Sequence, residues 1–197
     1  LIMRQPLKIN AQTCLISIVS ATAIALSFFS SLVVLRDGTV VLAQIFSTAG
    51  LIVPCLAGRF LFDEKISYVQ FGGLIVLMFA SSLMVTHNRD VKGRAGYKLY
   101  LALVLLLISN GTIMLSQKMF GLYVVDGNIY VFSFLTFSIA SLLMTPLFIL
   151  FGKNTAVNTL PEKLWFYAII LAASVLSINV LITTLSKEIP AIILFPL

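Results

Sequence analysis

The polar side chains within the apolar segments of this 197-residue chain are carboxamides and hydroxyls. These groups donate and accept hydrogen bonds without carrying charge. An unpaired amide in apolar surroundings is costly, so each must bond either to a neighbouring segment or to a polar solute. Three of the hydroxyls, those of Ser20, Ser27 and Ser31, are spaced by seven and four residues and therefore share one helical face.

Ionisable side chains are placed differently. All seven acidic residues and the single histidine, His87, fall between the apolar segments. The segments therefore contain no acid that could relay protons or ions, and no general acid–base pair. Cys14 and Cys55 lie inside apolar segments, where cysteine behaves as a small hydrophobic residue, and their spacing fits neither a disulfide framework nor a metal site. The sequence predicts no enzyme activity, no catalytic residue, no metal and no cofactor.

The elements that must position the polar groups are long apolar runs. Hydrophobic residues make up 60% of the chain and charged residues only 10%, against about 25% charged in a soluble domain. At about 1.5 Å per residue each complete run can cross a hydrocarbon core of about 30 Å, and in lipid such a run must be helical. We therefore predict an all-α polytopic membrane protein with six full helices and the start of a seventh. The runs are 13–35, 38–58, 66–86, 99–117, 127–152 and 164–186, with 189–197 beginning the next.

The net charge of +6 does not indicate a nucleic-acid-binding protein. Its basic residues are scattered over short predicted loops, such as Lys118 in a loop at 118–126, where they suit phospholipid headgroups. The expected surroundings are the lipid bilayer. The basic residues divide almost evenly between the two sides, so they do not fix the orientation.

The hydropathy pattern repeats after 151 residues. Run 13–35 overlays run 164–186, and the turn at Arg36–Asp37 overlays Lys187–Glu188. The repeating unit then contains five helices, an odd number, so the second copy enters the membrane from the opposite side. Such inverted repeats are common in secondary transporters, with the substrate site near the midplane. The register also predicts two helices before the first residue, and the rest of a ninth and a tenth after the last.

Gly50 and Pro54 interrupt the run 38–58. Proline removes a backbone hydrogen bond and glycine adds conformational freedom, so we expect a kink there. The pair are hinge candidates, and both a moving hinge and a static bend stay open.

The stretch from Ala49 to Leu83 resembles the EamA-type transporters of the drug/metabolite transporter superfamily. It reads AGLIVPCLAGRFLFDEKISYVQFGGLIVLMFASSL. Glu64 matches the acidic position in the turn between the fourth and fifth helices of that family, and Gln70 and Gly73 match the polar and small positions that follow. The end of the chain, 188–197, resembles the entry to the ninth helix. For Glu64 a structural role in the turn is favoured over an ion-coupling role.

The resemblance implies ten helices in two five-helix repeats, of which this chain is a fragment. Residues 1–86 would be the C-terminal part of the first repeat, 87–98 the linker, and 99–197 the N-terminal part of the second. It also implies that the helices present here line a central cavity. The candidate substrate-binding residues are Asn110, Gln44, Ser27, Ser47, Ser177 and Asn179.

For the serines, close packing between helices is the favoured role, whereas for Asn110 and Gln44 packing and solute binding are equally open. The function expected is secondary transport of a small metabolite or drug-like solute across the plasma membrane by alternating access. A seven-helix receptor and a non-transporting membrane subunit are the alternatives. A retinal-binding receptor would need a lysine inside a span, and the predicted runs hold none. A membrane enzyme would need converging acids, which the loop spacing does not provide.

Overall fold

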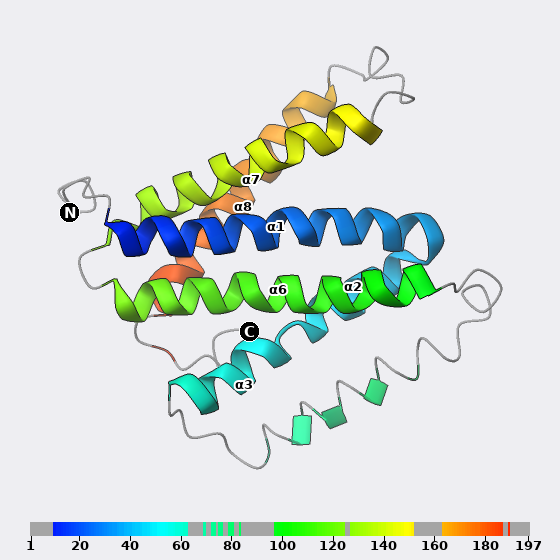
Figure 1. Cartoon of the computed structure of the whole chain (residues 1–197), viewed down its shortest axis with the longest axis horizontal. Helices are drawn as coiled ribbons and strands as arrows, with labels where there is room; N and C mark the ends of the chain where they lie inside the picture. The colour runs from blue at the N-terminus through cyan, green and yellow to red at the C-terminus, as the bar shows by residue number, and fades with distance from the viewer. Residues whose placement is uncertain are drawn as a thin grey trace.

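The computed structural model describes residues 10–62, 69, 72–73, 75–76, 79–80, 83, 97–124, 127–151, 163–186 and 189. Within these residues the regular structure is entirely helical (Figure 1). Five helical segments of the described chain are long and apolar enough to cross a membrane, which confirms an all-α, multi-pass membrane protein. The helices are α1 (Ala11–Asp37), α2 (Val40–Ala49), α3 (Ile52–Leu61), α6 (Tyr97–Tyr123), α7 (Ile129–Phe151) and α8 (Lys163–Leu185).

The predicted runs agree with these helices in place and differ at their ends. The turn predicted at Arg36 and Asp37 lies two residues later, because α1 continues through Asp37 and α2 begins at Val40, so Gly38 and Thr39 make the connection. The Thr39 hydroxyl accepts a hydrogen bond from the Leu42 N–H and so satisfies one free donor at the start of α2. The predicted run 66–86 and the segment 189–197 lie largely outside the described residues.

Helix α6 is the centre of the packing, with α1, α2, α3 and α8 against it, and α7 covers α1 (Figure 1). Val34, Leu42 and Leu99 are buried together at the end of the bundle where α1 turns into α2. At the opposite end Phe120 stacks on Phe132, with ring centroids 4.3 Å apart. Helix α1 therefore runs antiparallel to α6, while α2 and α3 run in the same direction as α6.

The kink expected in the run 38–58 appears as a break between α2 and α3. In a continuous helix the Gly50 carbonyl would accept from the N–H of residue 54, but Pro54 has none. It accepts instead from the Val53 N–H, at 3.1 Å, and the Leu51 N–H turns back to the Thr48 carbonyl at 3.0 Å. These tighter bonds of three-residue spacing keep the backbone paired through the bend.

The bend lies directly against the middle of α6. A Cβ atom added at Gly111 would lie 2.6 Å from the Gly50 carbonyl oxygen, and one added at Gly50 would lie 2.9 Å from the Leu107 carbonyl oxygen. Glycines at both positions thus let two backbones approach more closely than any side chain permits, as is usual for packed transmembrane helices. The approach fixes the neighbouring Asn110 beside the break.

One prediction about Lys118 is wrong. The sequence placed it in a loop at 118–126, yet α6 continues to Tyr123 and Lys118 is only 3% exposed. Its ammonium group donates to the Ile189 carbonyl at 2.8 Å, just beyond the end of α8. A second hydrogen bond joins the same two segments, because the Ser186 hydroxyl donates to the Gln117 carbonyl at 3.3 Å. The Ile189 carbonyl therefore supplies a hydrogen-bond acceptor for this buried ammonium group, which would be costly to bury without one.

Candidate functional site

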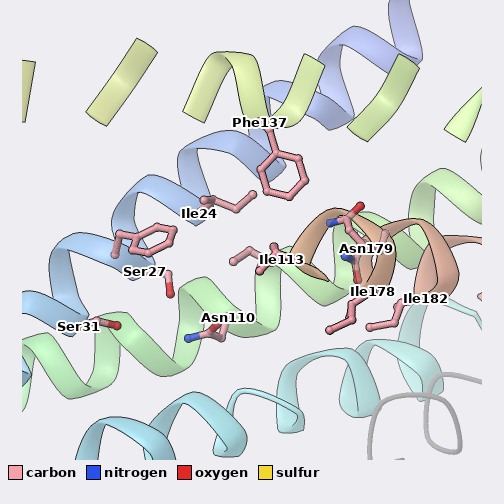
Figure 2. A pocket seen from close by; sticks show the side chains of 12 residues that line it. Ile24, Ser27, Ser31, Asn110, Ile113, Phe137, Ile178, Asn179 and Ile182 are labelled. Carbon is pink, nitrogen blue, oxygen red and sulfur yellow. The ribbon is translucent and has the colours of Figure 1, made fainter. Parts of the chain in front are cut away.

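A cavity of about 320 Å³ lies between α1, α6, α7 and α8 (Figure 2). Ile24 and Asn110, the middle residues of α1 and α6, both line it, so the cavity is at mid-depth of these two spans. Three of the residues predicted from the sequence meet in it, namely Ser27, Asn110 and Asn179. The full lining is Ile24, Ser27, Phe28, Ser31, Asn110, Ile113, Gln117, Phe137, Val175, Ile178, Asn179 and Ile182.

Polar groups gather toward the two ends of this cavity. In Figure 2, Ser27, Ser31 and Asn110 lie at one end and Asn179 at the other, with Ile113 between them. The antiparallel packing of α1 and α6 explains the first group. Ile113 packs with Ala21 and Ile24. Because the helices are antiparallel, one turn toward the C-terminus of α1 and one turn toward the N-terminus of α6 bring Ser27 and Asn110 together.

The hydrogen bonds within the protein leave different groups of the two asparagines available. The Asn110 Nδ2 group donates one of its two N–H groups to the Leu106 carbonyl at 3.0 Å, which leaves Oδ1 as an acceptor beside the second N–H. The Asn179 Oδ1 atom accepts from the Ser133 hydroxyl at 3.2 Å, which leaves the two N–H groups as donors. The cavity therefore offers an acceptor on α6 and a donor on α8.

Apart from the Gln117 amide the remaining wall is apolar, and the cavity opens to the outside of the bundle. Phe28 on α1 is 61% exposed and Ile178 on α8 is 56% exposed, so the mouth lies between these two helices. The inner wall is closed by Ile24, Ile113 and Phe137, which belong to one hydrophobic cluster with buried Ala21 and Ala140. A ligand would contact hydrocarbon over most of its surface and hydrogen-bonding groups at its ends.

The other sequence-predicted residues lie outside the cavity. Gln44 is exposed on α2, and Ser47 is partly buried on the same helix. Ser177 is exposed on α8, and its hydroxyl donates to the Ala173 carbonyl of its own helix at 2.8 Å. Gly73 is helical, with open space around a Cβ built on it. Glu64 and Gln70 lie outside the described residues.

Gln117 is a cavity residue that the sequence analysis missed. It is 4% exposed and follows Asn110 by seven residues, which returns it to the same face of α6. The signal was present as Asn110, Ile113 and Gln117 at helical spacing. The predicted run 99–117 placed Gln117 at the very end of a span, whereas α6 continues to Tyr123. Ser20 shares the α1 face with Ser27, but it is buried and its hydroxyl bonds to no described residue, so it serves in packing.

The arrangement suits binding by hydrogen bonds and apolar contact. Within the described residues no three of His, Cys, Asp and Glu gather as a metal site would require. The groups that line the cavity neither donate nor accept protons near neutral pH. The chemistry available to them is reversible recognition of a solute.

Comparison of the chain with family models, with curated proteins and with solved structures finds no match. The geometry of the cavity and the course of the helices therefore carry the functional argument.

Proposed function

We propose that this chain is part of a secondary transporter of the EamA type, which moves a small metabolite or drug-like solute across the plasma membrane by alternating access. The observation that carries the proposal is the cavity at mid-depth of α1 and α6, which holds amide and hydroxyl groups inside otherwise apolar spans. Polar groups are expensive at that depth, and those facing a cavity mark a solute pathway. Transporters bind their substrates near the bilayer midplane.

The directions of the helices support an inverted repeat. The segments 13–35 and 164–186 overlay each other in the sequence, and they correspond to α1 and α8. These two helices run in opposite directions (Figure 1). Opposite directions are what a repeat of five spans requires of equivalent helices.

The break between α2 and α3 offers a place where the helix could change its angle during transport. It lies beside Asn110, because a Cβ built at Gly50 would be 3.0 Å from the Asn110 Cβ. A solute that bonds to Asn110 more strongly in one arrangement of this helix would shift the population toward that arrangement. Gly50 and Pro54 thus connect solute binding to a change of access.

The test is solute uptake by the purified full-length protein in proteoliposomes, with a mixture of small labelled metabolites read by mass spectrometry. Asn110→Leu should abolish uptake. Gln44→Leu removes the same kind of amide from an exposed position on α2 outside the cavity and is the matched control. Asn110 and Gln44 have the same candidate role on the basis of the sequence, but only Asn110 lines the cavity.

Two results would count against the proposal. A correctly inserted protein that moves no member of the mixture would favour a receptor or a non-transporting subunit. Unchanged uptake by Asn110→Leu would remove the cavity from the transport pathway, even if transport itself occurs.

A further inference from the structure

The cavity also restricts the charge of its ligand. Of the twelve described side chains that line it, none is ionisable. Lys118 follows Gln117 in the sequence but is not among the lining residues, and its ammonium group is bonded to the Ile189 carbonyl. A charged solute would lose its water here without meeting an opposite charge, and that cost is large in apolar surroundings.

The shape of the polar pattern restricts the ligand further. The Asn110 acceptor with the Ser27 and Ser31 hydroxyls lies toward one end, and the Asn179 donors lie toward the other (Figure 2). Ile24, Ile113 and Phe137 form the wall between them. A ligand that leaves either polar end unpaired would bind less well, because buried donors and acceptors are costly when unsatisfied.

The volume indicates how large a part of a solute the cavity can enclose. A cavity of about 320 Å³ holds about ten water molecules at roughly 30 Å³ each. A solute that displaces them has about as many non-hydrogen atoms. This size is small for a drug and suits a short-chain metabolite.

We propose that the cavity binds an uncharged, two-ended solute of about ten non-hydrogen atoms, with a hydrogen-bonding group such as a carboxamide at each end of an apolar middle. The inference rests on the proposed function, since it names the solute class for the same cavity. It goes further in excluding free carboxylates and amines as preferred ligands.

The first experiment compares three probes of similar length that differ in charge. Adipamide is neutral, adipate is an anion and 1,6-diaminohexane is a cation. Binding to the full-length protein in lipid nanodiscs is followed by equilibrium dialysis and saturation-transfer NMR. Adipamide should bind saturably, in the millimolar range or tighter for a ligand of this size, and at least about tenfold more tightly than either charged probe.

Two variants assign the binding to this cavity. Asn110→Leu should weaken adipamide binding at least about fivefold, since a buried end of the ligand loses its partner. Asn110→Asp places a carboxylate of almost the same shape there and should reverse the order, with 1,6-diaminohexane bound more tightly than adipamide. Thr22→Val is the control on α1, because Thr22 is exposed and its hydroxyl bonds to the Val19 carbonyl. It should leave all three affinities unchanged.

The outcomes separate this inference from the proposed function. Equal or tighter binding of adipate or 1,6-diaminohexane, or no saturable binding of adipamide, would overturn the neutral-ligand inference while leaving transport open. Binding of adipamide that depends on Asn110 in a protein that transports nothing would overturn only the transport proposal. Binding that Asn110→Leu and Asn110→Asp both leave unchanged would place the ligand elsewhere and overturn the inference.

Discussion

Single residues decide what the cavity can hold, and the sequence identified some of them. Asn110 and Asn179 were candidates because amides within apolar runs need partners, and both line the cavity. Gln44 met the same criterion yet is exposed on α2. The difference could not be predicted, because an amide in a span reveals that it needs a partner but not which face of its helix meets the bundle.

Lys118 provides a test of how a buried cation is held. Lys118→Met keeps the length of the side chain and removes its ammonium group, leaving the Ile189 carbonyl without this donor. Loss of a partner for a buried acceptor costs about 1–3 kcal/mol. We expect a lower thermal unfolding midpoint in detergent and faster hydrogen exchange at residues 182–189.

Lys98→Met is the matched control for this substitution, because Lys98 is an exposed lysine on the same helix. A surface change of this kind should alter stability by no more than about 0.5 kcal/mol. Equal stability of the two variants would show that the Lys118 bond to the end of α8 contributes nothing measurable.

At the scale of elements, the break between α2 and α3 was predictable because proline has a fixed chemical effect on a helix. Pro54→Ala restores the missing N–H, which can then bond to the Gly50 carbonyl as in a continuous helix. We expect α2 and α3 to straighten. Double electron–electron resonance between spin labels at the exposed residues Val40 and Phe60, in a background lacking Cys14 and Cys55, should show a longer distance.

An unchanged distance in that measurement would mean that packing against α6, not Pro54, imposes the bend. Spin labels at Val40 and Phe60 should not disturb the packing, because both side chains lie on the outside of the bundle. Their distance before the substitution serves as the reference.

The close approach of α6 and the bend makes a second prediction at this scale. Gly111→Ala would place a methyl group 2.6 Å from the Gly50 carbonyl oxygen, so the backbones must separate. Overpacking of this kind costs about 1–3 kcal/mol. Gly72→Ala is the control, because a Cβ there has open space around it, and alanine favours a helix over glycine. Thermal unfolding should fall for the first variant and stay level or rise for the second.

The order in which the helices pack could not be predicted from the sequence. The spans are apolar over most of their circumference, so their few polar positions do not show which side meets lipid and which meets protein. The central place of α6 depends on small residues such as Gly111 that permit close contact, and small residues also occur elsewhere in the chain. The class of fold follows from composition, whereas the arrangement needs the structure.

For the whole molecule, the packing predicts which segments share a side of the membrane. Gly38 lies near Leu99, and the Phe62 ring is 6.3 Å from the Tyr123 ring. Cysteines at Gly38 and Tyr97 should therefore react with an impermeant maleimide from one side, and cysteines at Asn10 and Tyr123 from the other. Labelling of all four from the same side would contradict the antiparallel course of α1 and α6.

This course also places Phe62 and Tyr97 toward opposite ends of α6. The first lies on the Tyr123 side and the second on the Gly38 side. The predicted apolar run 66–86, most of which lies outside the described residues, is long enough to connect two sides of a membrane.

Helix α8 is buried at only one end. Its residues from Phe166 to Ile178 are exposed, whereas Asn179 and Thr183 in its last two turns are buried, as is Ser186 directly after its end. In mechanical terms α8 resembles a lever, with its exposed part as the arm and its buried end, at the cavity, as the pivot. Phe166 is about 20 Å from Asn179 along the axis, so a tilt of about 10° would sweep it through roughly 3 Å while Asn179 stays in place. A force on the outer part of α8 would therefore act about the cavity with a lever arm of about 20 Å.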